Sequence, residues 1–106
     1  MADVVSLSDL ESVPHATVFE EPPARTVRLE LAADQRVPSH SHPDTVIVLH
    51  LVSGQLELRL DEDHLELAAG DIVRFSGNRE IAPRAITDAA AVLVFCPAPV
   101  SGTDGV

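Results

Sequence analysis

Short segments in which apolar and polar residues alternate are the feature that most limits how this chain can fold. In residues 26–31 and 55–60 every second residue is apolar, which places the apolar side chains on one face of a half-buried strand. Residues 46–52 are rich in β-branched side chains, as is typical of strands. Turn residues bound three further short apolar segments, at residues 64–67, 72–75 and 91–95.

The spacing of these segments predicts the fold class. No segment has the period of an amphipathic helix, and the strands follow one another at intervals of about 8 to 12 residues. We therefore expect an all-β domain, built as a barrel or a two-sheet sandwich. Its core is expected to include Val46, Leu49, Leu51, Leu56, Leu58, Val73, Phe75, Val92 and Val94.

Connections and ends can also be predicted. Ser53-Gly54 indicates a tight hairpin between residues 46–52 and 55–60, and Asp61-Glu62-Asp63 indicates the next turn. We expect residues 1–14 to form an N-terminal arm, residues 15–99 a single barrel domain, and residues 100–106 a flexible C-terminal tail.

The charge of the chain excludes one class of partner. Its 17 acidic residues outnumber 7 basic ones, all of them arginine, and the net charge is −10. Such a charge repels phosphate backbones, and the absence of Trp and Tyr removes platforms on which bases stack. We therefore expect no nucleic-acid partner. The abundance of Asp and Glu, together with the lack of lysine, indicates a halophilic source, because a Debye length of about 3 Å at 1 M salt hides like-charge repulsion.

The same composition indicates a cytoplasmic protein without a membrane partner. The longest apolar run, residues 89–96, is far shorter than the about 20 residues that a membrane-spanning helix needs. The N-terminus carries Asp3, Asp9 and Glu11 and lacks the basic start of a secretory signal. Cys96 is the only cysteine, so an intrachain disulfide is impossible.

His40 and His42 are the residues that most suggest chemistry. Because side chains alternate along a strand, both imidazoles are expected on the same face, as in a chelating pair. Imidazole suits Zn, Fe, Ni, Cu and Mn, but two ligands hold a metal weakly. Two polar residues at a strand end beside prolines are the alternative explanation, so the pair alone does not decide.

The order of motifs around this pair is more specific. His40-Ser41-His42 is followed by Ser53-Gly54, then by Gly70-Asp71-Ile72-Val73 and Ala82-Pro83. Over roughly residues 25–96 this order resembles the two motifs of the cupin superfamily. The resemblance implies a double-stranded β-helix, that is, a jelly-roll barrel that commonly forms a homodimer. It also implies a metal site made of two histidines and a glutamate from the first motif and a histidine from the second.

Two of these four ligand positions carry other residues. The glutamate position falls on Ile47, and Pro83-Arg84 stands where the second motif commonly has Pro-His. At an effective dielectric of about 20, unit charges about 4 Å apart interact by about 4 kcal/mol, so Arg84 would repel a divalent ion by roughly twice that. We therefore expect ordinary cupin metal binding to be disfavoured.

A metal site could still form if Arg84 pointed out of the barrel and another side chain joined His40 and His42. The cofactor would then be a divalent transition metal such as Zn, Fe, Mn or Ni, bound weakly. In a continuous strand, His50 has the opposite parity to Ile47, which favours an outward position or a dimer contact. The candidates for further ligands are Asp44, His50 and His64.

The same substitutions favour an anion. If Arg84 converges with His40 and His42 on one cavity, an arginine fork and two imidazole N–H groups form a site for a carboxylate or phosphate. In the alternative interpretation, Arg84 pairs with a nearby Asp or Glu and the pocket is a remnant.

Three functions follow from these interpretations. The first is a barrel that binds a small anionic organic molecule at His40, His42 and Arg84, with or without catalysis. The second is a metal-dependent enzyme of the dioxygenase or isomerase type, with His40 and His42 as ligands. The third is a non-catalytic dimerising or sensory module, in which the apolar strand at residues 46–52 pairs with a second copy. The sequence leaves open whether the protein is an enzyme.

Overall fold

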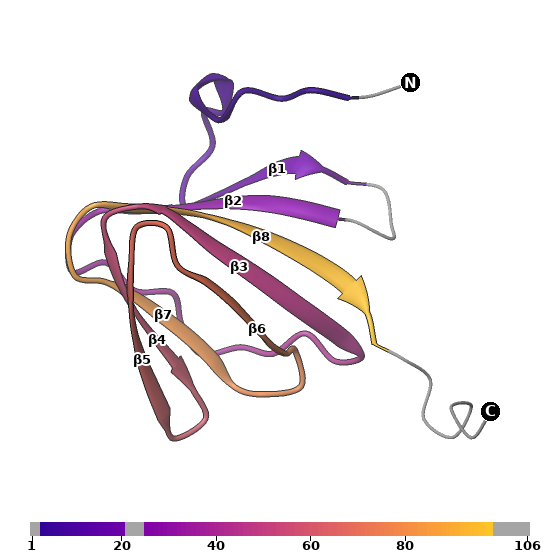
Figure 1. The fold of residues 1–106 in the computed structure, drawn as a ribbon, viewed down its shortest axis with the longest axis vertical. Coiled ribbons are helices and arrows are strands. Elements are labelled where there is room, and N and C mark those ends of the chain that lie inside the picture. Colours follow the sequence, from indigo (N-terminus) through magenta and orange to yellow (C-terminus); the bar gives the residue numbers. More distant parts are fainter. Residues whose placement is uncertain (1–2, 21–24, 99–106) are drawn as a thin grey trace.

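The alternating segments form antiparallel strands that are arranged in two sheets (Figure 1). The computed structural model describes residues 3–20 and 25–98. Within these residues there are eight strands and one short 3-10 helix, η1 (Leu7–Asp9). The strands are β1 (His15–Phe19), β2 (Arg25–Leu31), β3 (Thr45–Ser53), β4 (Gln55–Leu60), β5 (Asp63–Ala68), β6 (Ile72–Ser76), β7 (Ile81–Ala85) and β8 (Ala89–Pro97).

Six of these strands lie where the sequence predicts strands, and two were not predicted. β1 and β7 are the additional ones, and both lie at an edge of their sheet. β7 is difficult to recognise as a strand from its sequence because Pro83 stands at its centre. An edge strand tolerates proline, since it pairs fully on one side only.

The two sheets face each other and enclose one core. The larger sheet has the order β1-β2-β8-β3-β6 and the smaller one β5-β4-β7 (Figure 1). Leu49 and Leu51 of β3 meet Leu56 and Leu58 of β4 within a single cluster of buried side chains. This arrangement confirms the predicted all-β, jelly-roll class.

The predicted hairpin at Ser53-Gly54 is wrong. β3 pairs with β6 and β8, whereas β4 pairs with β5 and β7, so the chain crosses from one sheet to the other at this point. Gly54 has φ +81, and a Cβ atom there would lie 2.0 Å from the carbonyl oxygen of Asp88. The glycine is therefore required for a corner between sheets rather than for a hairpin turn.

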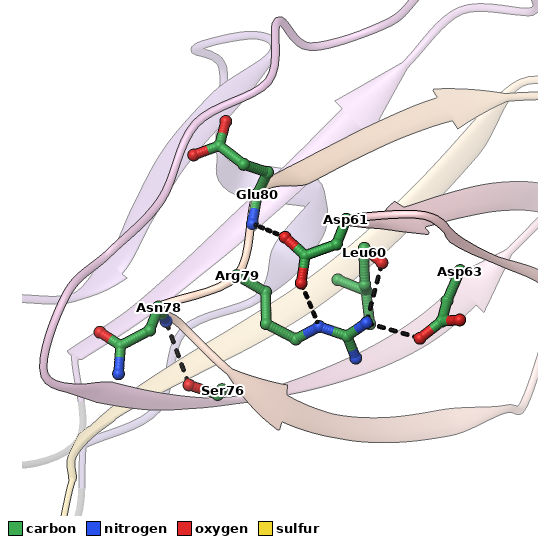
Figure 2. A network of polar contacts seen from close by, with 7 residues as sticks. All are labelled: Leu60, Asp61, Asp63, Ser76, Asn78, Arg79 and Glu80. Carbon is green, nitrogen blue, oxygen red and sulfur yellow. Dashed lines mark hydrogen bonds and ion pairs between the residues drawn. The ribbon is translucent and has the colours of Figure 1, made fainter.

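The turn predicted at Asp61-Glu62-Asp63 is present at Asp61-Glu62, where it joins β4 to β5, which pair as a hairpin. Arg79 reaches it from the β6–β7 connection, as Figure 2 shows. Its Nε donates to Asp61 at 2.8 Å, and its Nη2 donates to the carbonyl oxygen of Leu60 at 2.9 Å and to the Asp63 carboxylate. Arg79 thus ties two neighbouring connections at this end of the barrel.

Some of the predicted core lies elsewhere. Val46, Val92 and Val94 are only half-buried, because they alternate with inward residues such as Ile47 and Leu93 and so face away from the smaller sheet. Leu49, Leu51, Leu56, Leu58 and Phe75 are buried as expected, and Val73 is half-buried against them.

The N-terminal segment lies against the larger sheet. The Arg28 side chain is buried and donates to the carbonyl oxygen of Ser12 at 3.0 Å, and the Glu30 N–H donates to that of Pro14 at 2.7 Å. The tail predicted at residues 100–106 lies outside the described residues. In the described ranges, no helix has the length and apolar character needed to cross a membrane.

Candidate functional site

A cavity of about 420 Å³ lies between the two sheets. Most of the surface that lines it is apolar, and it comes from the central strands β2, β3, β4 and β8 together with β7. The lining residues are His15, Thr17, Arg25, Val27, Leu29, Val37, Pro38, Ser39, His40, His42, Ile47, Leu49, Leu58, Ile81, Pro83, Leu93 and Phe95.

The polar lining residues come from the edges of the fold. His15 lies on the edge strand β1, Arg25 is the first residue of β2, and His40 and His42 lie on the connection that leads to β3. The floor, by contrast, is made of apolar residues, most of them on central strands. The cavity therefore has a polar rim, which we define as His15, Thr17, Arg25, Ser39, His40 and His42.

Three aromatic rings and a guanidinium form a continuous series along this rim. The His40 and His42 rings meet edge to face with centroids 4.9 Å apart, and His42 meets the Phe95 ring at 4.9 Å in the same manner. The Arg25 guanidinium carbon lies 4.9 Å from the centre of the Phe95 ring. Phe95 thus stands between Arg25 and His42, where a cation–π contact helps to orient the arginine.

The backbone fixes His40 in this series. Its N–H donates to the Ile81 carbonyl oxygen at 3.1 Å, which attaches the connection to the edge of β7. Its ring Nδ1 lies 2.9 Å from the Pro38 carbonyl oxygen, so Nδ1 carries the proton of this hydrogen bond. In neutral His40, Nε2 is then an acceptor, and it becomes a second donor when the ring is protonated.

The environment opposes positive charge on two of these imidazoles. The pKa of His42 is lowered, first because burial disfavours the charged form and then because of the charges of His40, Arg25 and His15. The pKa of His15 is lowered by burial and then by His40 and Arg25. All four groups line the cavity, and an anion bound among them would reduce the repulsion between their positive charges.

Arg84 does not converge with the histidine pair. In β7 the side chains of Ile81, Pro83 and Ala85 are buried, so Arg84 points to the outside of the smaller sheet. There its Nε lies 3.4 Å from Glu57, and its Nη1 lies 3.4 Å from Asp34. The expected cavity with Arg84 beside His40 and His42 is thus corrected: strand parity turns the guanidinium outward, and Arg25 enters the cavity instead.

The further metal-ligand candidates also lie outside the cavity. Asp44 is exposed, and its N–H donates to the Asn78 side-chain oxygen at 3.1 Å. His50 is exposed on β3, on the face opposite to Ile47, as its parity predicts. His64 is exposed on β5, with Nδ1 3.7 Å from the Glu57 carboxylate. None of the three lines the cavity with His40 and His42.

The family model described as the cupin domain matches residues 27–97. The chain belongs to the cupin family. This cupin has no match among curated proteins.

Solved structures share its fold at low sequence identity. KdgF from Halomonas sp. has a TM-score of 0.79 and 16% identity, with 100% of both chains covered. An uncharacterized conserved protein with a double-stranded β-helix domain from Klebsiella pneumoniae has a TM-score of 0.81 and 20% identity over 92% of each chain. A protein described as a predicted oxalate decarboxylase from Thermotoga maritima has a TM-score of 0.71 and 17% identity over 78% of each chain.

The residues of this cupin do not fit the metal site that its family implies. Ile47 and Ile81 occupy the inward positions beside the histidine pair, and both are buried aliphatic side chains. Across residues 3–20 and 25–98, no three His, Cys, Asp or Glu side chains are arranged to hold a metal ion. Two imidazoles alone bind a metal weakly.

Sequence reasoning missed the two other basic residues of the rim, His15 and Arg25, as well as its hydroxyl residues Thr17 and Ser39. A signal for Arg25 was present, because it shares the parity of Val27, Leu29 and Leu31, which the alternating pattern places inward. His15 gave no comparable signal. It belongs to β1, and its place in the cavity depends on the pairing of β1 with β2.

Proposed function

We propose that this cupin binds a small organic anion in the cavity between its sheets. The observation that carries the proposal is the charge of the lining. Arg25, His15, His40 and His42 line the cavity, and no Asp or Glu appears among the described lining residues. In a chain with 17 acidic residues, this exclusion of carboxylates favours a ligand that brings its own negative charge.

The donors of the rim suit a carboxylate. A guanidinium presents a planar fork of N–H groups that matches two carboxylate oxygens, and protonated imidazoles donate further hydrogen bonds. The pKa values of His15 and His42 are lowered first by burial and then by the positive groups around them, and a carboxylate would offset this second cause. One structural neighbour carries the name of an enzyme for a small carboxylate, oxalate, which supports this class of ligand within the fold.

The proposed activity is binding without a chemical step. The two hydroxyl residues of the lining, Thr17 and Ser39, are both exposed at the rim. Ser39 donates its hydroxyl hydrogen bond to Glu80 at 2.8 Å rather than to an imidazole. This geometry gives no support to an activated nucleophile. The misfit of the metal site likewise gives no support to a metal-dependent reaction.

Calorimetric titration of the tag-free protein with a carboxylate such as butyrate tests the proposal, when the wild type is compared with a variant at Arg25. Arg25→Gln should weaken binding by about tenfold or more, because a hydrogen bond to a charged group contributes about 1.5–3 kcal/mol. Arg59→Gln is the matched control, since Arg59 lies in a different groove outside the cavity. Equal affinities for the wild type and Arg25→Gln would refute the site.

We propose homodimer formation as a separate, second function of the outer face of the larger sheet. We define this outer face by the outward residues of β3, β6 and β8, which are Val46, Val48, His50, Val52, Ile72, Arg74, Ser76, Ala90, Val92, Val94 and Cys96. Ile72 is 67% exposed and Val52 41%. None of these positions holds a carboxylate, so two copies of this acidic chain could meet here without placing carboxylates in direct contact.

A further inference from the structure

We infer that the anion bound by this cupin has an apolar body, as in an aliphatic or aromatic monocarboxylate, rather than a hydroxylated or second acidic body. This inference rests on the proposed function and adds the class of ligand. It follows from the separation of polar and apolar groups in the cavity: the donors all lie in the rim, and the floor beyond them is hydrocarbon.

The floor offers nothing for a hydroxyl group to bond. Its side chains include Val27, Leu49, Leu58 and Leu93, which have neither donors nor acceptors. They belong to β2, β3, β4 and β8, each of which has a neighbouring strand on both sides. The backbone N–H and C=O groups of these strands are therefore used within the sheets and are not available to a ligand.

This separation determines which anions can enter. A carboxylate placed at Arg25 and the imidazoles of His40 and His42 leaves the rest of the molecule against the floor. Hydroxyl groups or a second carboxylate there would lose their water without gaining partners, which is unfavourable. Methylene groups or an aromatic ring would instead be removed from water, which is favourable.

The size of the cavity agrees with such a ligand. Its volume is about 420 Å³, and an apolar cavity of about 150 Å³ already accepts a benzene ring. Half-buried Leu93 and Phe95 lie side by side in the lining, Leu93 paired with Leu49 and Phe95 with Ile47. A chain of several carbons can therefore extend from the rim across Phe95 to Leu93.

Calorimetric titration of the full-length, tag-free protein with straight-chain carboxylates from acetate to hexanoate tests the inference. The dissociation constant should fall by about fourfold for each added methylene until the floor is filled. Gluconate has the same charge and carbon number as hexanoate but carries hydroxyl groups, and it should bind about tenfold more weakly or worse. 1-Hexanol, which has the same chain without the charge, should also bind more weakly than hexanoate.

Paired variants locate the effect in the floor. Leu93→Thr should weaken hexanoate binding by about fivefold or more while leaving acetate binding unchanged, because it replaces apolar surface that only the longer chain reaches with a smaller side chain that carries a hydroxyl group. Val94→Thr is the matched control: it makes a similar change one residue along β8 on the outer face, and it should affect neither ligand.

The outcomes separate the inference from the proposed function. If gluconate binds as tightly as hexanoate, or if affinity is independent of chain length, the apolar-body inference is overturned and the anion site stands. If 1-hexanol binds as tightly as hexanoate, the anion site itself is overturned. If no carboxylate binds, both are overturned.

Discussion

His40 and Ile81 are joined by two backbone hydrogen bonds at the rim of the cavity. The His40 N–H donates to the Ile81 carbonyl oxygen at 3.1 Å, and the Ile81 N–H donates to the His40 carbonyl oxygen at 2.7 Å. These hydrogen bonds hold His40 and His42 beside the Ile81 side chain, which is only 3% exposed and cannot coordinate a metal. The rim therefore contains the two histidines of the first cupin motif without the glutamate and the second-motif histidine that complete the metal site implied by the family.

The missing ligands lead to a prediction about metal affinity. The wild-type protein should bind Zn²⁺ weakly and without fixed stoichiometry, because no three side chains of the described residues, His15 included, are arranged to hold a metal ion, and the His40–His42 pair alone provides too few ligands. Ile81→His should raise the affinity by about tenfold or more, since it adds a third imidazole beside the pair. Titration of the purified, tag-free proteins with Zn²⁺ measures both.

Ile86→His is the control for this experiment, because Ile86 is 36% exposed and does not line the cavity. It should leave the affinity unchanged. The wild-type titration remains decisive if Ile81→His does not fold: one tightly bound Zn²⁺ per wild-type chain would contradict the account.

Acid should destabilise the ligand-free protein through His15 and His42. Both pKa values are lowered from 6.5 in the folded state, first of all by burial. In the pH range between the lowered values and 6.5 the unfolded chain therefore binds more protons than the folded one, so stability decreases as pH falls through this range. Thermal melting between pH 8 and pH 5 measures the effect, and His42→Asn should reduce it.

His64→Asn is the matched control, because His64 is exposed on β5, outside both the cavity and the outer face. It should leave the pH profile unchanged. Saturating hexanoate should flatten the profile of the wild type, since a bound carboxylate favours the protonated imidazoles and raises their pKa values. Stability that rises as pH falls from 6.5 would contradict this explanation.

Two glycines with positive φ should respond differently to alanine. Gly70 has φ +99 and open space around its Cβ position. Gly70→Ala should therefore reduce the free energy of unfolding by about 1–2 kcal/mol, the cost of the left-handed backbone conformation. Gly54→Ala adds a collision with Asp88, and it should reduce this free energy by about 2–5 kcal/mol in total. Urea denaturation compares the two, and equal losses would argue against the corner at Gly54.

We expect a single charge introduced on the outer face of the larger sheet to disrupt the proposed dimer. Val48 lies near its centre, paired with Val94 on one side and Arg74 on the other. Val48→Glu should convert a dimer to a monomer at micromolar concentration, because it would bury two like charges at the interface. Size-exclusion chromatography with light scattering measures this. Ile86→Glu is the control and should stay dimeric, whereas a monomeric wild type would refute the interface.

Salt should stabilise the protein if its acidic composition reflects a halophilic origin. The net charge is −10, and the Debye length falls from about 10 Å at 0.1 M to about 3 Å at 1 M salt. Repulsion between carboxylates weakens accordingly, so the midpoint of thermal unfolding should rise with NaCl over this range. A midpoint that does not change would remove the argument for a halophilic source.

Local patterns in the sequence predict the strands well, but they do not predict which strands pair. Alternation in residues 55–60 places Leu56 and Leu58 on one face, and both are buried. The prediction of a hairpin at Ser53-Gly54 was wrong because a short connection that contains glycine is compatible with either a hairpin or a corner between sheets. The distinction depends on Asp88, which lies against Gly54 from a distant part of the chain.

The candidate site was predicted in part. His40 and His42 both line the cavity, with their rings in contact, but they lie on the connection that leads to β3 and not in the strand that the spacing argument assumed. Arg84 was placed by motif position alone, whereas its direction depends on the parity of β7, which was not predicted as a strand. Arg25 enters the cavity because β2 pairs with β8, which sets Arg25 opposite Phe95.

The distribution of histidines allows a direct test of the central claim, that a small organic anion binds in the cavity. Of the 5 histidines, His15, His40 and His42 line the cavity, and His50 and His64 lie outside it. NMR spectra of the imidazole groups, recorded during titration with hexanoate at constant pH, report on all of them at once. The account predicts saturable shifts of the three cavity histidines with little change in the other two. Shifts confined to His50 and His64, or no shifts at all, would contradict it.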